Sequence, residues 1–186
     1  RLQHHAQTHV HALELEQGFS VGQGSGICFV PVLHDGNSQH SPEEIHAIDQ
    51  LVHELTGLPY MAQRGQCQGT IEPQDILVIA PYNLQVGYLK EKLGDRARIG
   101  TVDKFQGQEA PVLILSMCSS NKETIPRGLD FLLNPNRINV AISRAQCLSI
   151  VVGSPAIAKA HCQKIEEIPL VNLFCKLIHS KTSSVL

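Results

Sequence analysis

Short apolar runs that alternate with helical segments constrain the fold of this 186-residue chain more than any other feature. Runs typical of buried strands lie at Ile27–Leu33, Ile76–Ala80, a short stretch from Ile99, Val112–Met117 and Cys147–Gly153. Strands of this kind with helices between them predict a parallel sheet that is covered on both faces. We therefore expect an α/β fold with about five strands, in a chain long enough for one full core.

Local signals place the helices between these runs. Ser41-Pro42-Glu43-Glu44 has the form of a capping box with proline at the first helical position, and Gly57 ends that helix. Leu84, Tyr88, Leu89 and Leu93 mark a second helix that Gly94 closes. Asn134-Pro135 opens a third helix and Ser154-Pro155 a short one. The spacing of apolar residues over 170–178 predicts an amphipathic helix at the end of the chain. By composition, residues 57–75 are expected to form a loop and residues 118–134 a surface excursion.

The first 26 residues are expected to be a lead-in and linker before a domain at 27–186. His5 and His9 would share one face of a helix, but no carboxylate or cysteine completes a ligand set, so we predict no metal site. The glycine-rich stretch 22–26 lacks the Gly-Lys-Ser/Thr ending of a phosphate loop and precedes a strand. We interpret it as a flexible connector.

Composition narrows the functional classes. A net charge of −2 gives no basic footprint for nucleic acid, and three Tyr, five Phe and no Trp argue against a broad base-stacking platform. The six cysteines lack metal-binding spacing and are typical of a reducing, cytoplasmic location. No apolar stretch approaches the ~18 residues of a membrane span, and no secretory signal is found. The chain starts with Arg1, which we interpret as the mark of a fragment.

Three blocks carry a family resemblance: Ala80–Gln85, Gly100–Glu109 and Asn139–Ala145. In this order they resemble motifs IV, V and VI of superfamily 1 DNA/RNA helicases, on the branch that includes the RNA-surveillance helicases. The resemblance covers about residues 76–153 and implies the second RecA-like domain of a P-loop NTPase. More loosely, residues 27–58 resemble bacterial relatives with a RecB-like nuclease ahead of the helicase.

The resemblance implies that ATP and Mg²⁺ are held mainly by a first RecA-like domain, with Arg144 reaching across as an arginine finger. A guanidinium suits this role because it stabilises the charge that spreads over the γ-phosphate oxygens. Arg137 lies seven residues earlier, so we expect both arginines to project from one helix face and Arg137 to contact ATP as well. Val86 stands where many relatives have a motif IV arginine, and whether Arg137 compensates is left open.

Motif V is expected to contact both ligands. The resemblance assigns Gln106, Gly107 and Glu109 to ATP, since Gly107 permits close backbone approach and Glu109 would accept hydrogen bonds from ribose hydroxyls. It assigns Thr101 and Val102 to the nucleic-acid backbone. Motif IV would add Tyr82 and Gln85 to the nucleic-acid contacts. Because ligands collect at the carboxyl ends of strands in such sheets, we expect motifs IV and V to meet there.

No G-x-x-x-x-G-K-[ST] sequence or magnesium-binding acidic block occurs, so this chain alone is predicted not to hydrolyse ATP. The sequence predicts the second motor domain of an ATP-dependent DNA or RNA helicase. Its expected partners are single-stranded DNA or RNA, the first RecA-like domain and an upstream nuclease domain. The alternative is a non-catalytic nucleic-acid or protein-binding module. A Rossmann enzyme is disfavoured because no strand–G-x-G-x-x-G–helix unit is present.

Overall fold

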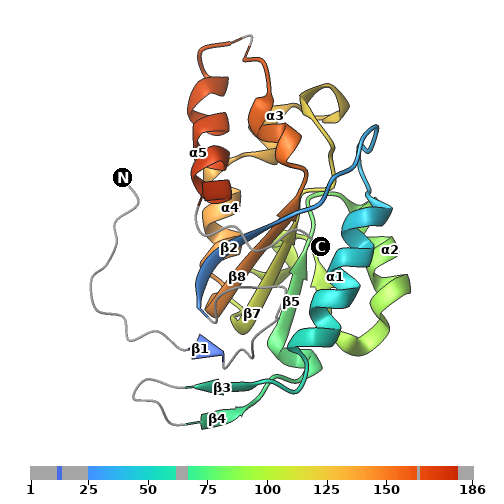
Figure 1. Ribbon diagram of the computed structural model, residues 1–186, viewed down its shortest axis with the longest axis vertical. Coiled ribbons are helices and arrows are strands. Elements are labelled where there is room, and N and C mark those ends of the chain that lie inside the picture. The colour runs from blue at the N-terminus through green and yellow to red at the C-terminus, as the bar shows by residue number, and fades with distance from the viewer. Residues whose placement is uncertain (1–11, 14–24, 62–66, 163, 180–186) are drawn as a thin grey trace, which may run out of the picture.

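A five-stranded parallel sheet forms the centre of the molecule (Figure 1). The computed structural model describes residues 12–13, 25–61, 67–162 and 164–179. The strand order is β2-β8-β7-β5-β6. These strands are β2 (Gly26–Pro31), β5 (Ile76–Ile79), β6 (Arg98–Gly100), β7 (Ala110–Ser116) and β8 (Ala145–Gly153). The predicted α/β fold is confirmed, and it is the architecture that the RecA-like resemblance implies.

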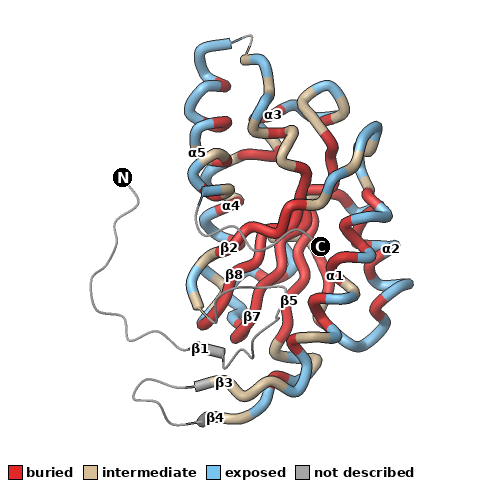
Figure 2. The backbone as a smooth tube through the Cα atoms, viewed as in Figure 1, coloured by how far each residue is buried: buried red, intermediate tan, exposed pale blue. Residues whose placement is uncertain are grey.

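Helices cover both faces of this sheet. The helices α1 (Pro42–Leu55) and α2 (Asn83–Leu93) lie on one side, and α3 (Leu129–Leu132), α4 (Pro135–Ile142) and α5 (Glu167–His179) lie on the other (Figure 1). Alternate strand residues divide between two cores: Val78 and Ile150 pack toward α1 and α2, whereas Leu77 and Val151 pack toward α3, α4 and α5. The strands are therefore buried on both faces (Figure 2).

A small antiparallel sheet lies apart from the main one. It joins β1 (Ala12–Leu13), β3 (Pro59–Met61) and β4 (Cys67–Thr70) in the order β1-β3-β4. The prediction of a loop over 57–75 is wrong here, because antiparallel backbone pairing forms without the apolar pattern that marks buried strands. His5, His9 and most of the glycine-rich stretch lie outside the described residues.

The expected N-terminal caps of α1 and α4 form, but the reciprocal half of the capping box at Ser41 does not, because the Ser41 amide donates to Gln85 Oε1 instead of to Glu44. Ser41 Oγ accepts a hydrogen bond from the Glu44 amide of α1 at 3.2 Å. The Asn134 side chain accepts hydrogen bonds from the Asn136 and Arg137 amides at 3.0 and 3.2 Å, opening α4. Both caps satisfy amides that have no partner within their helix.

Two expectations need correction. Of the apolar residues that mark α2, Leu84 and Tyr88 are 47% and 43% exposed, because the stripe that faces the sheet comprises Val86, Leu89 and Leu93. The segment 118–134 is not a surface excursion. It contains α3 and the turn η4 (Lys122–Thr124). Its apolar residues pack into the core beside α5, and they are Ile125, Leu129, Leu132 and Leu133.

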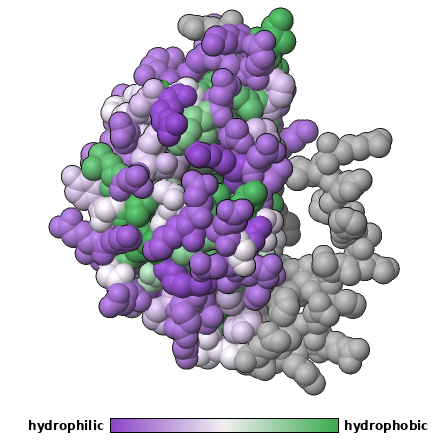
Figure 3. All heavy atoms as spheres, turned by 180° about the vertical axis from the view of Figure 1, so that it is seen from behind, coloured by the Kyte–Doolittle hydropathy of each residue, from purple (hydrophilic) through white to green (hydrophobic). Residues whose placement is uncertain are grey.

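The remaining turns are 3-10 helices, one of which replaces the short helix expected at Ser154-Pro155. They are η1 (Pro73–Asp75), η2 (Gly94–Arg96), η3 (Val102–Phe105) and η5 (Pro155–Lys159). Seen from behind, the surface is mostly hydrophilic with small separate apolar patches (Figure 3). Within the described ranges, no helix is long and apolar enough to cross a membrane, and no three His, Cys, Asp or Glu residues gather to hold a metal ion.

Candidate functional site

Glu109 and Arg144, two of the five positions assigned to ATP, meet at the amino ends of the strands. Glu109 and Arg144 each immediately precede a strand, β7 and β8, and Ala110 pairs with Ala145 in register. The Ala110 amide donates a hydrogen bond to the Arg144 carbonyl at 3.0 Å. Arg144 therefore lies on the same side of the molecule as Glu109 and its neighbour Gly107. This is the amino edge of the sheet, whereas the sequence predicted the carboxyl edge.

Motif V crosses from one edge of the sheet to the other, which explains this difference. Thr101 and Val102 follow the carboxyl end of β6, and the turn η3 continues to the buried Phe105. The segment 106–109 then reaches the amino end of β7. A connection between parallel strands must run back along their full length, so one motif serves both edges.

The segment 106–109 is exposed and held in place by Arg98. Arg98 Nη1 donates to Gln108 Oε1 and Nη2 to the Glu109 carbonyl, both at 3.1 Å. Gly107 has a φ of +77°, which a residue with a side chain adopts only with strain, and no atom lies within 4 Å of where a Cβ would be. The backbone of Gly107 is thus open to a ligand.

Arg144 lies just beyond the end of α4, whose C-cap is Ser143. Its Nε donates to the Val140 carbonyl at 3.1 Å and its Nη2 to Ser143 Oγ at 3.4 Å. A cation is favourable at this helix end because the last carbonyls have no helical partners. Within the described residues Arg144 makes no ion pair, so its positive charge is not neutralised by a carboxylate.

Arg137 lies in the first turn of α4 and Arg144 just beyond its C-cap, so the two arginines lie at opposite ends of this helix. The expected contact of Arg137 with ATP stays a prediction. Arg137 Nη2 is 3.9 Å from Asp103 Oδ2, and its guanidinium lies 4.7 Å from the centre of the Phe131 ring. It lines a cavity of about 210 Å³ at the carboxyl ends of β5, β6 and β7, together with Thr101 and Val102. We call this space the carboxyl-edge cavity.

Tyr82 and Gln85 support this cavity from behind. The Tyr82 ring is buried against Phe131, with 5.5 Å between ring centres, and burial raises the pKa of its hydroxyl. Gln85 is fully buried; its Nε2 donates to Ser116 Oγ and its Oε1 accepts from the Ser41 amide, both at 2.9 Å. The expected direct contacts of these two side chains with nucleic acid are therefore corrected to supporting roles.

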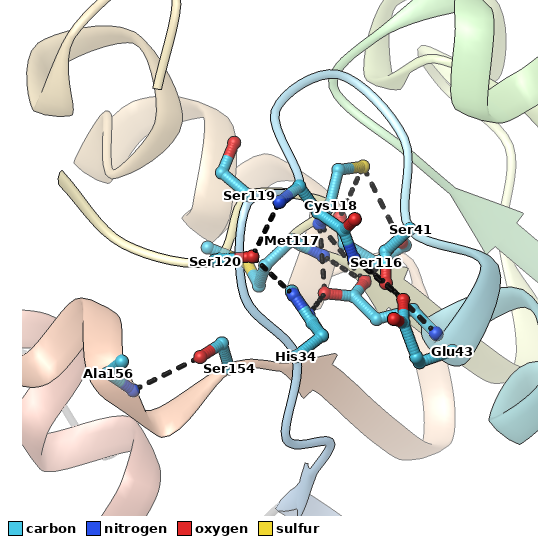
Figure 4. A network of polar contacts seen from close by, with 12 residues as sticks. His34, Ser41, Glu43, Ser116, Met117, Cys118, Ser119, Ser120, Ser154 and Ala156 are labelled. Atoms are coloured by element: carbon cyan, nitrogen blue, oxygen red, sulfur yellow. Dashed lines mark hydrogen bonds and ion pairs between the residues drawn. The ribbon is translucent and has the colours of Figure 1, made fainter. Parts of the chain in front are cut away.

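The sequence analysis missed a buried carboxylate, that of Glu44, which is bound to the cavity-lining residue Ser116. Figure 4 shows the surrounding polar network, including His34, Ser116 and Cys118. Glu44 accepts hydrogen bonds from His34 Nε2 at 2.9 Å, Ser116 Oγ at 2.6 Å, and the amides of Met117 and Cys118 at 3.0 Å. The His34 and Glu44 side chains are fully buried. Cys118 has a φ of +67°, so this network holds an unusual backbone conformation where β7 ends.

Three functional candidates other than Glu44 were also missed: Arg98, Arg127 and Phe131. Arg127 and Phe131 lie in the segment 118–134, which was expected to be a surface excursion, and no local pattern there signals their contact. Glu44 lies four residues before Ile48 and seven before Leu51, on the apolar stripe of α1, and an acid in that position signals a buried carboxylate.

Comparison with known proteins gives a family match and several helicase relatives. Residues 22–156 match the family described as AAA domain. A Caenorhabditis elegans protein, uncharacterized ATP-dependent helicase C05C10.2, is 36% identical over 63% of this chain and 7% of its own length. The Mus musculus RNA helicase Mov10l1 is 38% identical over 46% of this chain and 8% of its own length. The Drosophila melanogaster regulator of nonsense transcripts 1 homolog is 36% identical over 47% of this chain and 8% of its own length.

The chain spans less than a tenth of the length of each of these three relatives. The family match, however, covers well over half of the chain and includes all three motif blocks. The chain therefore belongs to the AAA domain family, as a helicase-like domain similar to the superfamily 1 RNA helicases.

Proposed function

We propose that this chain is the second RecA-like motor domain of an ATP-dependent helicase, with ATP at the amino edge of its sheet and a single strand of DNA or RNA at the carboxyl edge. The observation that carries the proposal is the meeting of Gly107, Glu109 and Arg144 on one edge, while Thr101 and Val102 lie on the other. One polypeptide segment, motif V, reaches both.

The amino edge fits a nucleotide. Gly107 leaves room for close approach of a phosphate or sugar, and the exposed Glu109 carboxylate would accept hydrogen bonds from ribose hydroxyls. Gln106 is exposed beside them. ATP would supply the phosphoanhydride whose cleavage drives the motor, and Mg²⁺ would accompany it, both held mainly by the first RecA-like domain.

Arg144 has the charge and position of an arginine finger. Among the described residues, its guanidinium binds a carbonyl and a hydroxyl of its own helix end, contacts that cost little to exchange for phosphate oxygens. Guanidinium donors match the geometry of phosphate oxygens, and those contacts are charge-assisted on both sides. Arg98 would hold the Glu109 carbonyl in position without touching the nucleotide.

The proposal also covers the partners of this domain and its location in the cell. The first RecA-like domain must supply the phosphate loop that these 186 residues lack, and the motor would work in the cytoplasm. The proposal of an upstream nuclease domain is supported only by the looser resemblance of residues 27–58 to bacterial relatives.

The substitution Arg144→Ala tests the finger in a protein that carries both RecA-like domains. We expect strand-stimulated ATP hydrolysis to fall by about 10³-fold or more, because a finger of this kind contributes that much to the rate. The matched control is Arg96→Ala, which removes the same charge at a different place. Arg96 lies in the turn after α2, is half-exposed and pairs with Asp49 of α1. Turnover within tenfold of the wild type, in a variant with unchanged melting temperature, would reject the role of Arg144.

A second test uses the 186-residue chain alone. We expect no ATP turnover above that of buffer, with or without single-stranded nucleic acid, because no residue of this sequence forms a phosphate loop. Turnover that persists through purification and disappears in the Arg144→Ala variant would contradict the division of labour between two domains.

A further inference from the structure

Two arginines from different segments stack on one aromatic ring at the carboxyl edge. The Arg127 guanidinium lies 4.0 Å from the centre of the Phe131 ring, and that of Arg137 lies 4.7 Å from the same centre. Arg127 precedes α3, and Arg137 lies in the first turn of α4. All three residues line the carboxyl-edge cavity.

The positive charge of this pair is not neutralised. Arg127 is exposed and makes no ion pair within the described part of the chain. Among the described residues, Arg137 pairs with one carboxylate, that of Asp103 at 3.9 Å, and the Asp103 side chain is 81% exposed, so this pair is weak. In a chain whose net charge is −2, two arginines that contact one ring and line one cavity form a local site for an anion.

The geometry favours a phosphate over a nucleic-acid base. Because both guanidinium groups already lie against the Phe131 ring, that ring is not free to stack on a base. A guanidinium that stacks on a ring still presents its N–H groups around its rim, and this fork matches phosphate oxygens. The ring fixes the two side chains before any ligand arrives, which lowers the entropic cost of binding.

The rest of the cavity adds donors of the same kind. Thr101, at the carboxyl end of β6, and Asn83, the first residue of α2, both line it. Hydroxyl and amide donors commonly contact phosphate and sugar oxygens, and such contacts carry no sequence information. Gln85 and Tyr82 hold the cavity wall, through Ser116 and Phe131 respectively.

We propose that Arg127 and Arg137, positioned by Phe131, form a clamp for backbone phosphates of a single-stranded nucleic acid, whatever its base sequence. The clamp rests on the proposed function, which brings a single-stranded nucleic acid to the carboxyl edge of the sheet. It assigns Arg137 to contact with the nucleic acid instead of with ATP. The residues Arg127 and Phe131 lie outside the three motif blocks, so the clamp extends the track beyond them.

The test is the salt dependence of strand binding by the intact protein without nucleotide. The probes are fluorescently labelled oligothymidine and oligouridine of equal length, titrated from about 50 to 200 mM potassium chloride. We expect Arg127→Gln and Arg137→Gln each to lower the slope of log affinity against log salt by about 0.7, as for one lost single-strand phosphate contact. The loss should be equal for both probes and for mixed-sequence strands.

Two further variants sharpen this test. Arg96→Gln removes the same charge from the turn after α2 and should leave the slope unchanged. Phe131→Leu keeps both charges but removes their support, so it should weaken binding while changing the slope by less than either arginine variant. Melting temperatures establish that each variant is folded.

The outcomes separate this inference from the proposed function. If the wild type binds strands and the arginine variants keep its salt slope, the clamp is overturned and the proposed function stands. If those variants weaken a non-hydrolysable ATP analogue instead, the pair serves the nucleotide and the clamp is again overturned. If the wild type binds no strand, both fail together.

Discussion

Glu44 shows most clearly how one residue organises the carboxyl edge. Its buried carboxylate accepts hydrogen bonds from a histidine, a serine and two backbone amides, which come from two separate stretches of chain. A buried charge is tolerated only when it is paired and hydrogen-bonded in this way. The network fixes the end of β7, where Ser116 and Met117 line the carboxyl-edge cavity.

Removal of this carboxylate should destabilise the fold strongly. We expect Glu44→Leu to lower the free energy of unfolding by about 3–5 kcal/mol, because the His34 ring and two amides lose their acceptor inside the protein. The neighbouring exposed Glu43 provides the control, and Glu43→Gln should cost less than about 1 kcal/mol. Urea unfolding measures both. Equal costs for the two variants would show that the network contributes nothing special.

Cysteine reactivity tests the environment of single thiols. Burial raises the pKa of Cys147 to about 11 and that of Cys118 well above its usual range. Since the thiolate is the reactive form, both should resist iodoacetamide at pH 8, while the half-buried Cys162 and Cys175 are alkylated faster. Raising the pH toward 11 should increase the labelling of Cys147 in the folded protein. Peptide mass mapping reads each site, and labelling of Cys147 as fast as Cys162 at pH 8 contradicts the assignment.

At the scale of elements, α5 closes one face of the sheet. Phe174 is fully buried and meets the Phe29 ring of β2 edge-on, with 5.8 Å between ring centres. Phe174→Ala should therefore lower the free energy of unfolding by about 3–5 kcal/mol, the usual cost of the cavity left by a large aromatic residue. Ile168→Ala, at a 47% exposed position of the same helix, should change it by less than about 0.5 kcal/mol. Thermal or urea unfolding compares them, and similar losses would mean that α5 is not docked through Phe174.

The elements that the sequence predicts well are those with local chemistry. The Asn134 and Ser41 caps are visible as residue types at fixed offsets, and the apolar strands are visible as uninterrupted runs. The strands β3 and β4 have neither signal. The segment that holds Leu129 and Leu132 was interpreted as surface because its polar residues outnumber the apolar ones that anchor it. Burial there depends on packing against α5, which is distant in sequence.

At the scale of the whole molecule, the two edges of the sheet divide the candidate functions. The motifs predict which residues contact ATP and which contact nucleic acid. They contain no information on how far the segment that joins two β-strands extends across the sheet. Thr101 and Glu109 are eight residues apart in one motif, yet they lie at opposite ends of the strands. Likewise the heptad spacing of Arg137 and Arg144 suggests a shared face, whereas α4 ends before Arg144 and separates the pair.

The helix α4 spans this separation. Its eight residues give it a length of about 12 Å, with Arg137 in its first turn and Arg144 directly beyond its last. Because an α-helix of two turns bends very little, a rigid-body shift of α4 would carry the backbone at both of its ends together. Such a shift would reach both rims of the sheet without a hinge between them.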